Sequence, residues 1–456
     1  MSDTPQVTAR LAEFVAALRF EDLPTTTRSR AKSLTLDLIG SMVRASRESD
    51  STPCLEASLK TMGLDAPGPC TVVGAGWKVA PAVAALANGM LGHSLDFDDT
   101  HADSSLHPSA PVVPAALAVG EQVGASGREI LTAIVAGYEV CCRLGNALDP
   151  TAHYARGFHP TATAGTFGAA AATAKLHGLD AEGIARAFGV SGSQAAGSLQ
   201  FLANGGWNKR WQVGQAAMNG VMAGALASNG FHAAAAPIEG EHGFLKGYTD
   251  GADFDKAVHG LGTVWETEHV AIKPYPACRY THAALDGLKA LREEEGLTTA
   301  AFKRVGIGLH RNGITLTADP LPAKRRVRSV VEGQFSMPFT AAVMIDQGSF
   351  GWDDYKRLGD ERLDAICERI DVFRDESLEG LAHPFGATLT VETGAGAFER
   401  RIADPSGEPA TFPDEGAVRA KFLDLAEPVL DGRAGEMADF FLGLEERNGL
   451  SGILAP

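Results

Sequence analysis

The chain has 456 residues, a length that favours two or more domains over one. Its composition, 45% hydrophobic and 21% charged, is close to the average of globular proteins and excludes disordered, collagen-like and coiled-coil classes. The formal net charge of −16 argues against binding to nucleic acid or to an anionic membrane surface. A ligand that is itself an anion must therefore meet a local positive charge.

The N-terminal segment carries an acid near its start and no basic stretch followed by an apolar core, and no later run of 18 uncharged apolar residues occurs. The six cysteines include no CxxC pair, and Cys141 and Cys142 lie in an apolar helical pattern. We therefore expect reduced, mostly buried thiols and a cytoplasmic protein.

The spacing of apolar residues is typical of helices up to about residue 264. Apolar residues recur at helical spacing within residues 11–18 and 34–42, and Ser126 with Glu129 forms a capping box that opens another helix. After residue 264, β-branched clusters alternate with helical stretches, and the helical period returns after residue 405. The strand-like clusters are residues 305–310, 314–317, 370–373 and 387–403.

These patterns predict a mainly α protein with two domains. The larger is an all-helical domain of residues 1–264 plus 406–456. The smaller is an α+β domain of residues 265–405, inserted before the C-terminal helices.

The densest polar segment spans residues 93–109. Within twelve residues it holds Asp96, Asp98, Asp99, His101, Asp103 and His107. Like charges this close repel each other unless a positive or protonated group lies among them. Three interpretations compete: a solvated loop, a divalent-metal site, and a metal-free acid/base site. The spacing matches neither HExxH nor an EF-hand loop, so the acid/base interpretation is favoured.

Two His-Pro dipeptides precede Ala-rich helical sequence, at His107-Pro108 and His159-Pro160. The residue before a proline is pushed toward an extended conformation, so each histidine is expected at a helix N-terminus. Free amide N–H groups at such an end favour an anion, while the imidazole can transfer a proton. A purely structural role for a proline at a helix start is the alternative.

Two further segments carry cations. Lys209 lies between Trp207 and Trp211, where it is either a loop residue or a contact for a substrate carboxylate. The segment of residues 273–282 has a proline-rich lead-in, and it places His282 one turn before Asp286. That spacing predicts that Asp286 orients the imidazole of His282.

Four of these segments together resemble the successive signature blocks of the MmgE/PrpD family, whose enzymes include dehydratases, decarboxylases and epimerases of small carboxylates. The blocks are HSLDFDDTH…HPS, GFHPTATAGTFGAAAATAKLHGLD, NKRWQVGQAA and KPYPACRYTHAALDG. The similarity runs from about residue 7 to residue 440. The resemblance implies the two-domain architecture above, a homodimer, and no metal or organic cofactor.

The resemblance also implies a site. Its expected catalytic residues are Asp96, His107, His159, Lys209 and His282. Thr100 is expected to bind the substrate, together with the cations Lys273 and Arg279. The tyrosine that the decarboxylase branch takes from its smaller domain has no counterpart that can be placed in the stretch of residues 320–338.

We therefore expect a metal-independent lyase that acts on a small di- or tricarboxylate by His/Lys acid–base catalysis. Dehydration of a 2-methylcitrate-like hydroxy-polycarboxylate is favoured, with cis-aconitate-type decarboxylation and iminodisuccinate-type epimerisation as alternatives. Each reaction makes or consumes a carbanion-like centre beside a carboxylate, which Lys209 and the helix N-termini would stabilise. Outside this class stand a metal-dependent lyase using Asp96, Asp98 and Asp99, and a non-catalytic binding protein.

Overall fold

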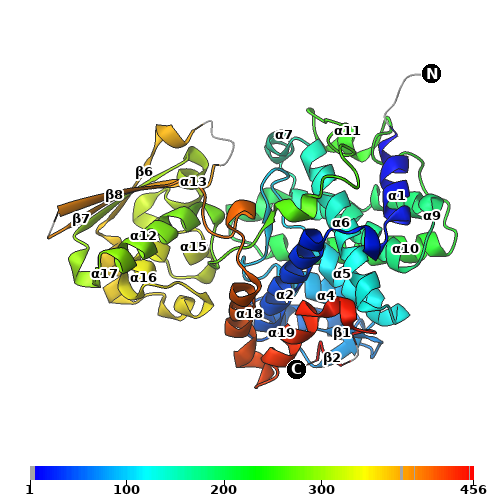
Figure 1. Cartoon of the computed structure of the whole chain (residues 1–456), viewed down its shortest axis with the longest axis horizontal. Coiled ribbons are helices and arrows are strands. Elements are labelled where there is room, and N and C mark those ends of the chain that lie inside the picture. The colour runs from blue at the N-terminus through cyan, green and yellow to red at the C-terminus, as the bar shows by residue number, and fades with distance from the viewer. Residues whose placement is uncertain (1–5, 380–383, 395, 451, 456) are drawn as a thin grey trace. The chain divides into compact units, whose positions relative to one another are not determined.

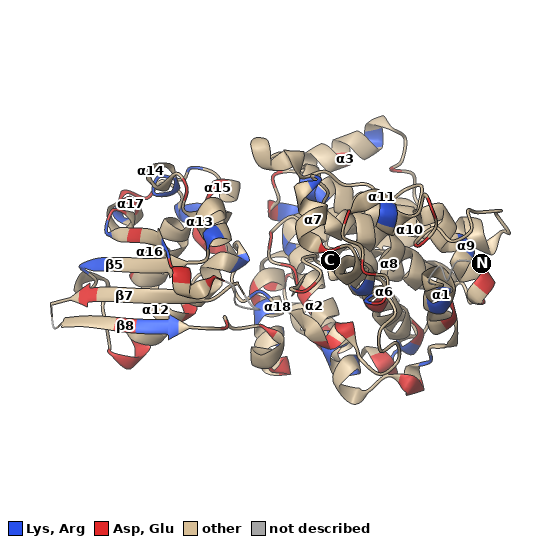
Figure 2. Ribbon diagram, turned by 90° about the horizontal axis from the view of Figure 1, so that it is seen from above, with Lys and Arg blue, Asp and Glu red and all other residues tan. Residues whose placement is uncertain are grey.

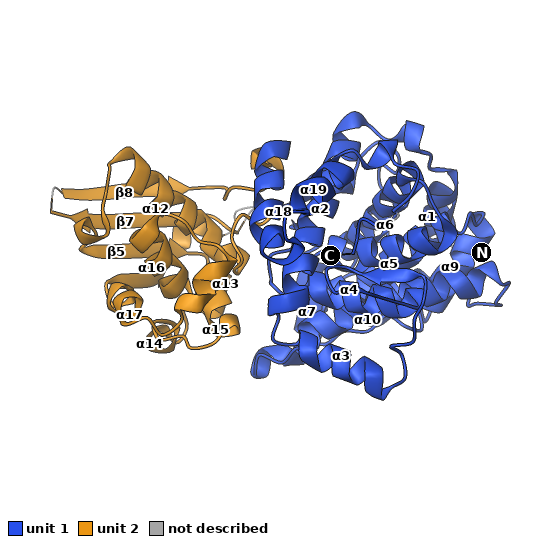
Figure 3. Ribbon diagram, turned by 90° about the horizontal axis from the view of Figure 1, so that it is seen from below, with its two compact units in different colours: residues 1–272, 414–456 blue, residues 273–413 orange. Residues whose placement is uncertain are grey.

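The computed structural model describes residues 6–379, 384–394, 396–450 and 452–455. The chain divides into two compact units, residues 1–272 with 414–456 and residues 273–413 (Figure 1; Figure 3). The larger unit is mainly helical, and the smaller unit combines helices with a four-stranded sheet. The predicted mainly α fold, with an α+β domain inserted before the C-terminal helices, is therefore confirmed.

The core of the larger unit is a set of helices around α8 (Pro160–Leu176). Helices α5 (Ser109–Val123), α6 (Gly127–Ala147) and α10 (Asn208–Ser228) pack on α8, and α4 (Pro81–Gly92) packs on α5 and α10. Helix α8 carries one charged residue, Lys175, and its ribbon is almost entirely uncharged (Figure 2). Its small residues allow the neighbouring backbones to approach closely.

The other helices of this unit lie around that core. They are α1 (Val7–Ala17), α2 (Thr25–Glu48), α3 (Thr52–Thr61), α7 (Pro150–Ala155), α9 (Ala181–Ser191), α11 (Phe244–Tyr248), α18 (Glu415–Leu430) and α19 (Ala434–Leu442). Helices α18 and α19 pack on α2, so the two ends of the sequence share one core. The predicted capping box of Ser126 and Glu129 is present at the start of α6.

The larger unit is not strictly all-helical, because it contains two short antiparallel pairs. Strand β1 (Cys70–Val72) pairs with β2 (Trp77–Val79), and β3 (Thr100–His101) pairs with β4 (Val270–Ala271). The second pair joins residues that are far apart in the sequence, Thr100 with Ala271 and His101 with Val270, and it holds the polar segment of residues 93–109 against residues 270–271.

The sheet of the smaller unit has the order β6-β5-β7-β8. Its strands are β5 (Arg304–Leu309), β6 (Ile370–Arg374), β7 (Ala387–Thr393) and β8 (Gly396–Ile402), and only the β5–β6 pairing is parallel. Helices α12 (His282–Glu294), α16 (Met337–Gln347) and α17 (Glu361–Cys367) accompany it, α12 on β7 and β8 and α16 on β6. The short helices α14 (Leu321–Lys324) and α15 (Val330–Gln334) complete this unit.

One strand prediction is wrong. Residues 314–317 belong to helix α13 (Arg311–Thr317) rather than to a strand. His310 precedes this helix, and its Nδ1 accepts the amide N–H of Asn312 at 3.2 Å. This cap starts a helix in spite of the β-branched residues that follow.

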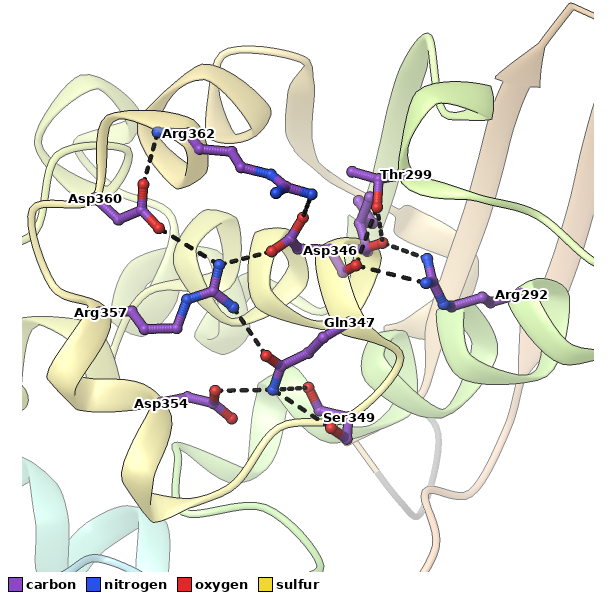
Figure 4. Close-up of polar contacts among 10 residues, drawn as sticks. Arg292, Thr299, Asp346, Gln347, Ser349, Asp354, Arg357, Asp360 and Arg362 are labelled. Carbon is purple, nitrogen blue, oxygen red and sulfur yellow. Dashed lines mark hydrogen bonds and ion pairs between the residues drawn. The ribbon is translucent and has the colours of Figure 1, made fainter.

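Arginine side chains close the C-terminal end of α16 (Figure 4). Arg292 donates to the carbonyl oxygen of Ile345 at 2.6 Å, and Gly348 follows with the left-handed conformation of a helix C-cap. Arg357 and Arg362 each lie 2.6 Å from a carboxylate oxygen of Asp346. The Arg292 contact satisfies a carbonyl group that the helix end leaves without a partner, and Arg357 and Arg362 balance the charge of Asp346.

The unit boundaries differ from the predicted ones by eight residues at each crossing, because local contacts decide them. Residues 265–272 stay with the larger unit, since Thr267 donates to Glu139 and β4 pairs with β3. Residues 406–413 stay with the smaller unit, since Ser406 donates to Asp286.

Five of the six cysteines are buried thiols and Cys54 is exposed, as expected. Within the described residues, every helix is too short or too polar to cross a bilayer.

Close packing of α10 on α8 predicts a specific sensitivity at Gly220. A Cβ atom there would lie 2.6 Å from the carbonyl carbon of Ala169 and 2.8 Å from the amide nitrogen of Ala170. Gly220→Ala should therefore lower the free energy of unfolding by about 1–3 kcal/mol in denaturant titrations. Gly247→Ala is the matched control, because a Cβ atom at Gly247 meets nothing within 4 Å. Equal stability of the two variants would contradict this account of the packing.

Candidate active site

Most of the polar segment of residues 93–109 is buried in the larger unit, and Asp103 is its exposed residue. His93 follows α4 directly, and Pro108 precedes α5, so two core helices fix the ends of the segment. Asp98 and Asp99 are at most 1% exposed. The solvated-loop interpretation of this segment is therefore wrong.

Asp98 lies between two imidazoles. Its Oδ2 is 2.7 Å from Nδ1 of His93 and 3.3 Å from Nδ1 of His107. Burial alone would raise the pKa of Asp98, but the two histidines lower it well below its usual value. For His93, burial outweighs the attraction of Asp98 and lowers the pKa to about 4. At neutral pH the cluster thus holds an ionised carboxylate beside a neutral His93.

One ring nitrogen of this cluster, Nε2 of His93, is buried without a hydrogen-bond partner. Nδ1 of His107 is also buried, but it faces Oδ2 of Asp98. The rings of His93 and His107 meet edge to face with centroids 4.8 Å apart. A buried nitrogen atom is ordinarily paired, so Nε2 of His93 marks a place where a ligand atom or a proton is to be received.

The pKa of Asp99, the next residue, is shifted in the opposite direction. Its Oδ2 accepts the Ser109 hydroxyl at 2.5 Å, and that hydroxyl is also 2.5 Å from the Tyr138 hydroxyl. Burial first, and then the charge of Asp98, raise the pKa of Asp99 well above its usual value. The pKa values of two adjacent carboxyls are therefore moved apart, as acid/base sites show.

His159 is the N-cap residue of α8, as its place before Pro160 predicts. The amide group of Gln212 donates to Nδ1 of His159 at 2.8 Å, while Oε1 of Gln212 accepts the backbone N–H of Ser198 at 2.9 Å. A backbone N–H can only donate, so the orientation of the Gln212 amide is fixed and Nδ1 of His159 must accept.

The tautomer of His159 follows from this contact. With Nδ1 accepting, the ring proton lies on Nε2, so the neutral ring presents a hydrogen-bond donor at Nε2. Burial lowers the pKa of His159 well below its usual value, and the nearby His93 and Lys209 lower it further. The ring of His159 also stacks on His93, with centroids 6.0 Å apart.

Lys209 contacts a carboxylate of the protein itself. Its Nζ lies 2.5 Å from Oδ1 of Asp96, and the Lys209 side chain is 22% exposed. Asp96 has a φ of 52°, in the left-handed region that aspartate tolerates better than most residues. Trp207 and Trp211 are among the exposed large hydrophobic residues, and Lys209 lies on α10 rather than in a loop.

Five of the predicted site residues thus lie in the larger unit, and four of them are close together. Asp96 pairs with Lys209, His107 shares Asp98 with His93, and His159 stacks on His93. Thr100 is half-buried on β3.

The other three predicted residues belong to the smaller unit, where Arg279 is the centre of a local network. Its guanidinium donates to Glu408 and to the carbonyl oxygen of Ser406, and its Nη1 lies 2.9 Å from Nδ1 of His282. Arg279 is 5% exposed. These contacts indicate that Arg279 positions His282 rather than contacting substrate directly. Lys273 is buried at the start of this unit.

Asp286 does not orient His282. Nε2 of His282 lies 3.1 Å from the carbonyl oxygen of Ala277, and its Nδ1 faces Arg279. Asp286 instead accepts the hydroxyls of Tyr275 and Ser406, each at 2.8 Å. The one-turn spacing therefore predicted the wrong partner.

His93 and Gln212 were not predicted as site residues. His93 opens the first signature block, but nothing in its spacing identifies Asp98 as its partner. Gln212 is three residues after Lys209 on α10, so the helical period places both on one side of that helix. That period was the signal that could have identified Gln212.

The cluster of His93, Asp98 and His107 could also hold a divalent ion, because one ligand atom from each lies within 4.8 Å of the others. This set differs from the predicted metal alternative of Asp96, Asp98 and Asp99. Asp96 is paired with Lys209, and Asp99 is bonded to Ser109. Only Asp98 of that predicted set remains a candidate ligand.

Comparison with known proteins agrees with the architecture. Residues 9–257 match the MmgE/PrpD N-terminal domain, and residues 275–441 match the MmgE/PrpD C-terminal domain. The chain therefore belongs to the MmgE/PrpD family, and this membership supports lyase activity.

Several relatives carry a more specific name. The chain is 28% identical to a cis-aconitate decarboxylase of Aspergillus terreus, over 98% of this chain and 95% of that protein. It is 27% identical to a cis-aconitate decarboxylase-like protein of Aspergillus oryzae, over 99% and 98%. It is also 28% identical to the cis-aconitate decarboxylase of Homo sapiens, over 59% and 56%.

The Gln212–His159 contact predicts a pH effect. Gln212→Glu replaces the amide donor by a carboxylate that accepts from Nδ1, so the pKa of His159 should rise. The acid limb of the kcat profile should then move to higher pH, and turnover should fall roughly 10-fold or more. Titration of the histidine Cε1–H signals by NMR measures the same change without substrate. Gln212→Leu is the uncharged control, and it should shift the pKa less. An unchanged His159 titration in Gln212→Glu would contradict the assigned tautomer.

Proposed function

We propose that this protein is a metal-independent lyase for a small polycarboxylate, and that decarboxylation of a cis-aconitate-like tricarboxylate is its reaction. The family membership supports lyase chemistry. The names of relatives that match nearly the whole chain support decarboxylation over the dehydration that the sequence favours.

The observation that carries the proposal is the buried Asp98 carboxylate with its two imidazoles. An ionised carboxylate that contacts Nδ1 of His107 aims the opposite nitrogen, Nε2, away from itself. The His107 side chain is 15% exposed, whereas those of His93 and Asp98 are fully buried. His107 is therefore the member of the cluster that can reach a substrate.

A decarboxylation needs two things from these residues. The carbon–carbon bond to one carboxylate breaks, CO2 leaves, and the electron pair stays on the remaining carbon framework, where an acid must deliver one proton. The developing negative charge lies beside carboxylates that are already anionic, so fixed positive groups must stabilise it. We assign proton delivery to His107 and charge stabilisation to Lys209.

His159 takes a different part. Its Nε2–H is a neutral hydrogen-bond donor held in place by Gln212. The lowered pKa of His159 keeps its ring neutral at neutral pH. The neutral ring orients a substrate carboxylate by donating a hydrogen bond from Nε2–H. Thr100 is proposed as a substrate contact on the basis of the family resemblance.

Dehydration of a 2-methylcitrate-like hydroxy acid is the second candidate. In a dehydration, a base removes a proton from carbon while an acid protonates the departing hydroxyl. The same two histidines, His107 beside the Asp98 carboxylate and the neutral His159, would serve as this pair. Epimerisation of an iminodisuccinate-like compound needs a base on each face of one carbon. The three reactions differ in product, so one assay distinguishes them.

The test is incubation of the chelator-treated protein with cis-aconitate, 2-methylcitrate, citrate and iminodisuccinate in D2O, followed by NMR. We expect CO2 release and one deuterium in the product from cis-aconitate. An alkene product from 2-methylcitrate without CO2 would replace the decarboxylase by the dehydratase. Activity that requires added Mg2+ or Zn2+ would contradict the metal-independent mechanism.

The turnover of His107→Ala should be lower by roughly 10²-fold or more, with the fold intact.

Lys209 gives a second test of the proposal. Lys209→Met keeps most of the side-chain volume but removes the charge, so turnover should fall by a factor that corresponds to about 3 kcal/mol. The change also leaves Asp96 without this partner, which could lower stability. The double variant Lys209→Met/Asp96→Asn removes both charges and should be equally inactive while recovering the melting temperature. Lys246→Met, at an exposed lysine of the same unit, is the control. Unchanged kinetics in Lys209→Met would show that this lysine of α10 takes no part in the reaction.

A further inference from the structure

We propose that His101, Glu266 and His269 of the larger unit form a second site, which binds a divalent transition-metal ion such as Zn2+. This site is distinct from the cluster of His93, Asp98 and His107. It is independent of the proposed lyase reaction, because none of its three residues is assigned a part in that reaction.

Backbone structure brings the three side chains together. His101 lies on β3 opposite Val270 of β4, so His269 is the residue next to its partner. Glu266 and His269 are the first and last residues of a 3-10 helix, Glu266–His269. Side chains three residues apart eclipse in a 3-10 helix, so these two lie one above the other.

The ligand atoms have the separation that an ion requires. One atom from each residue lies within 4.8 Å of the other two, and Nε2 of His101 is 3.1 Å from Oε2 of Glu266. The rings of His101 and His269 are nearly parallel, at 10°, with centroids 6.4 Å apart. Tetrahedral zinc with ligands at 2.0–2.2 Å implies a ligand-to-ligand distance of about 3.4 Å. Small side-chain movements would bring the three atoms onto one ion.

The nitrogen that would bind the ion faces the carboxylate. Nε2 of His101 is buried and lies 3.1 Å from Oε2 of Glu266. On the other side of the ring, the Ser104 backbone N–H donates to Nδ1 at 3.3 Å, and the Ser104 hydroxyl lies 2.7 Å from the same nitrogen. Without an ion the ring proton therefore lies on Nε2, toward Glu266. An ion at Nε2 would displace that proton and leave a proton on Nδ1, which the Ser104 hydroxyl is placed to accept. Metal-bound histidines ordinarily have such a partner on the second nitrogen.

A cavity adjoins the site and gives an ion access to it. Its volume is about 400 Å³, and Glu266 is part of its wall. The other wall residues are Asp103, Asn146, Asp255, Lys256 and His259. Three carboxylates face one lysine there, so the wall favours a cation. Two imidazoles and a carboxylate with an open fourth position are a ligand set typical of zinc and of neighbouring first-row ions.

Binding at this site would tie β3 to the 3-10 helix that precedes β4. An ion that binds the folded protein and not the unfolded chain raises stability in proportion to the logarithm of its concentration over Kd. The expected consequence is a higher melting temperature of the protein in the presence of Zn2+.

The experiment uses the full-length protein after removal of metal with a chelator. Zn2+ is titrated by calorimetry, and melting is followed with and without Zn2+. We expect one equivalent to bind at this site and the melting temperature to rise. His269→Ala changes an exposed residue, so the fold should survive, and affinity should fall on the order of 100-fold. Glu266→Gln should give the same loss, whereas His232→Ala, at an exposed histidine elsewhere, should bind Zn2+ as the unmodified protein does.

Two outcomes would overturn the proposal. One is binding that His269→Ala and Glu266→Gln leave unchanged. The other is that Asp98→Asn no longer binds the equivalent of Zn2+ while His269→Ala and Glu266→Gln still bind it. That result would place the ion at the cluster of His93, Asp98 and His107. Because calorimetry and melting need no substrate, failure of this site would leave the proposed lyase reaction intact, and failure of the reaction would leave this site intact.

Discussion

The charge of Asp98 is the constraint on which the polar interior of the larger unit depends. A carboxylate that is fully buried keeps its charge only if neighbouring groups replace the water it has lost. His93 at the end of α4 and His107 before α5 supply that replacement. Removal of either ring would leave the buried Asp98 charge without one of its partners. Because both rings must contact the same carboxylate, the end of α4 and the start of α5 are held close to each other.

The neighbouring Asp99 explains how a chain of net charge −16 can bury so many acids in one segment. Two adjacent aspartates point into different surroundings, one toward imidazoles and the other toward the hydroxyls of Ser109 and Tyr138. Hydroxyls do not balance the charge of a carboxylate as a cation does, so burial raises the pKa of Asp99 while the histidines lower the pKa of Asp98. Asp96 has a third solution, a direct contact with Lys209. Each of these three aspartates is therefore stabilised in the interior by a different kind of partner: a lysine, two imidazoles or two hydroxyls.

The sequence predicts the helical period, the inserted α+β unit and most of its strands, because these depend on local patterns. It fails where tertiary contacts override a local preference. Residues 314–317 have β-branched side chains but follow a histidine cap, and they form a helix. Asp286 has the spacing to orient His282 but is used by Tyr275 and Ser406. The signature blocks contain Asp96, His107, His159 and Lys209. The helical period of α10 could have identified Gln212, but the contacts of Asp98 with His93 and His107 are tertiary, and no local spacing reveals them.

Strand β3 links the two sites of the larger unit. Successive side chains of a strand point to opposite faces, so Thr100 and His101 face different surroundings. Thr100 belongs by resemblance to the substrate site, and His101 belongs to the proposed metal site. An ion at His101 would restrict the same two-residue strand that carries Thr100, and it would do so through the backbone and not through a chain of side-chain contacts. The β3–β4 pairing also fixes the last residues of the larger unit before Lys273. Metal binding there would therefore act on the position of Thr100 and on the exit of the chain from the larger unit, while the charge of Asp98 would stay unchanged.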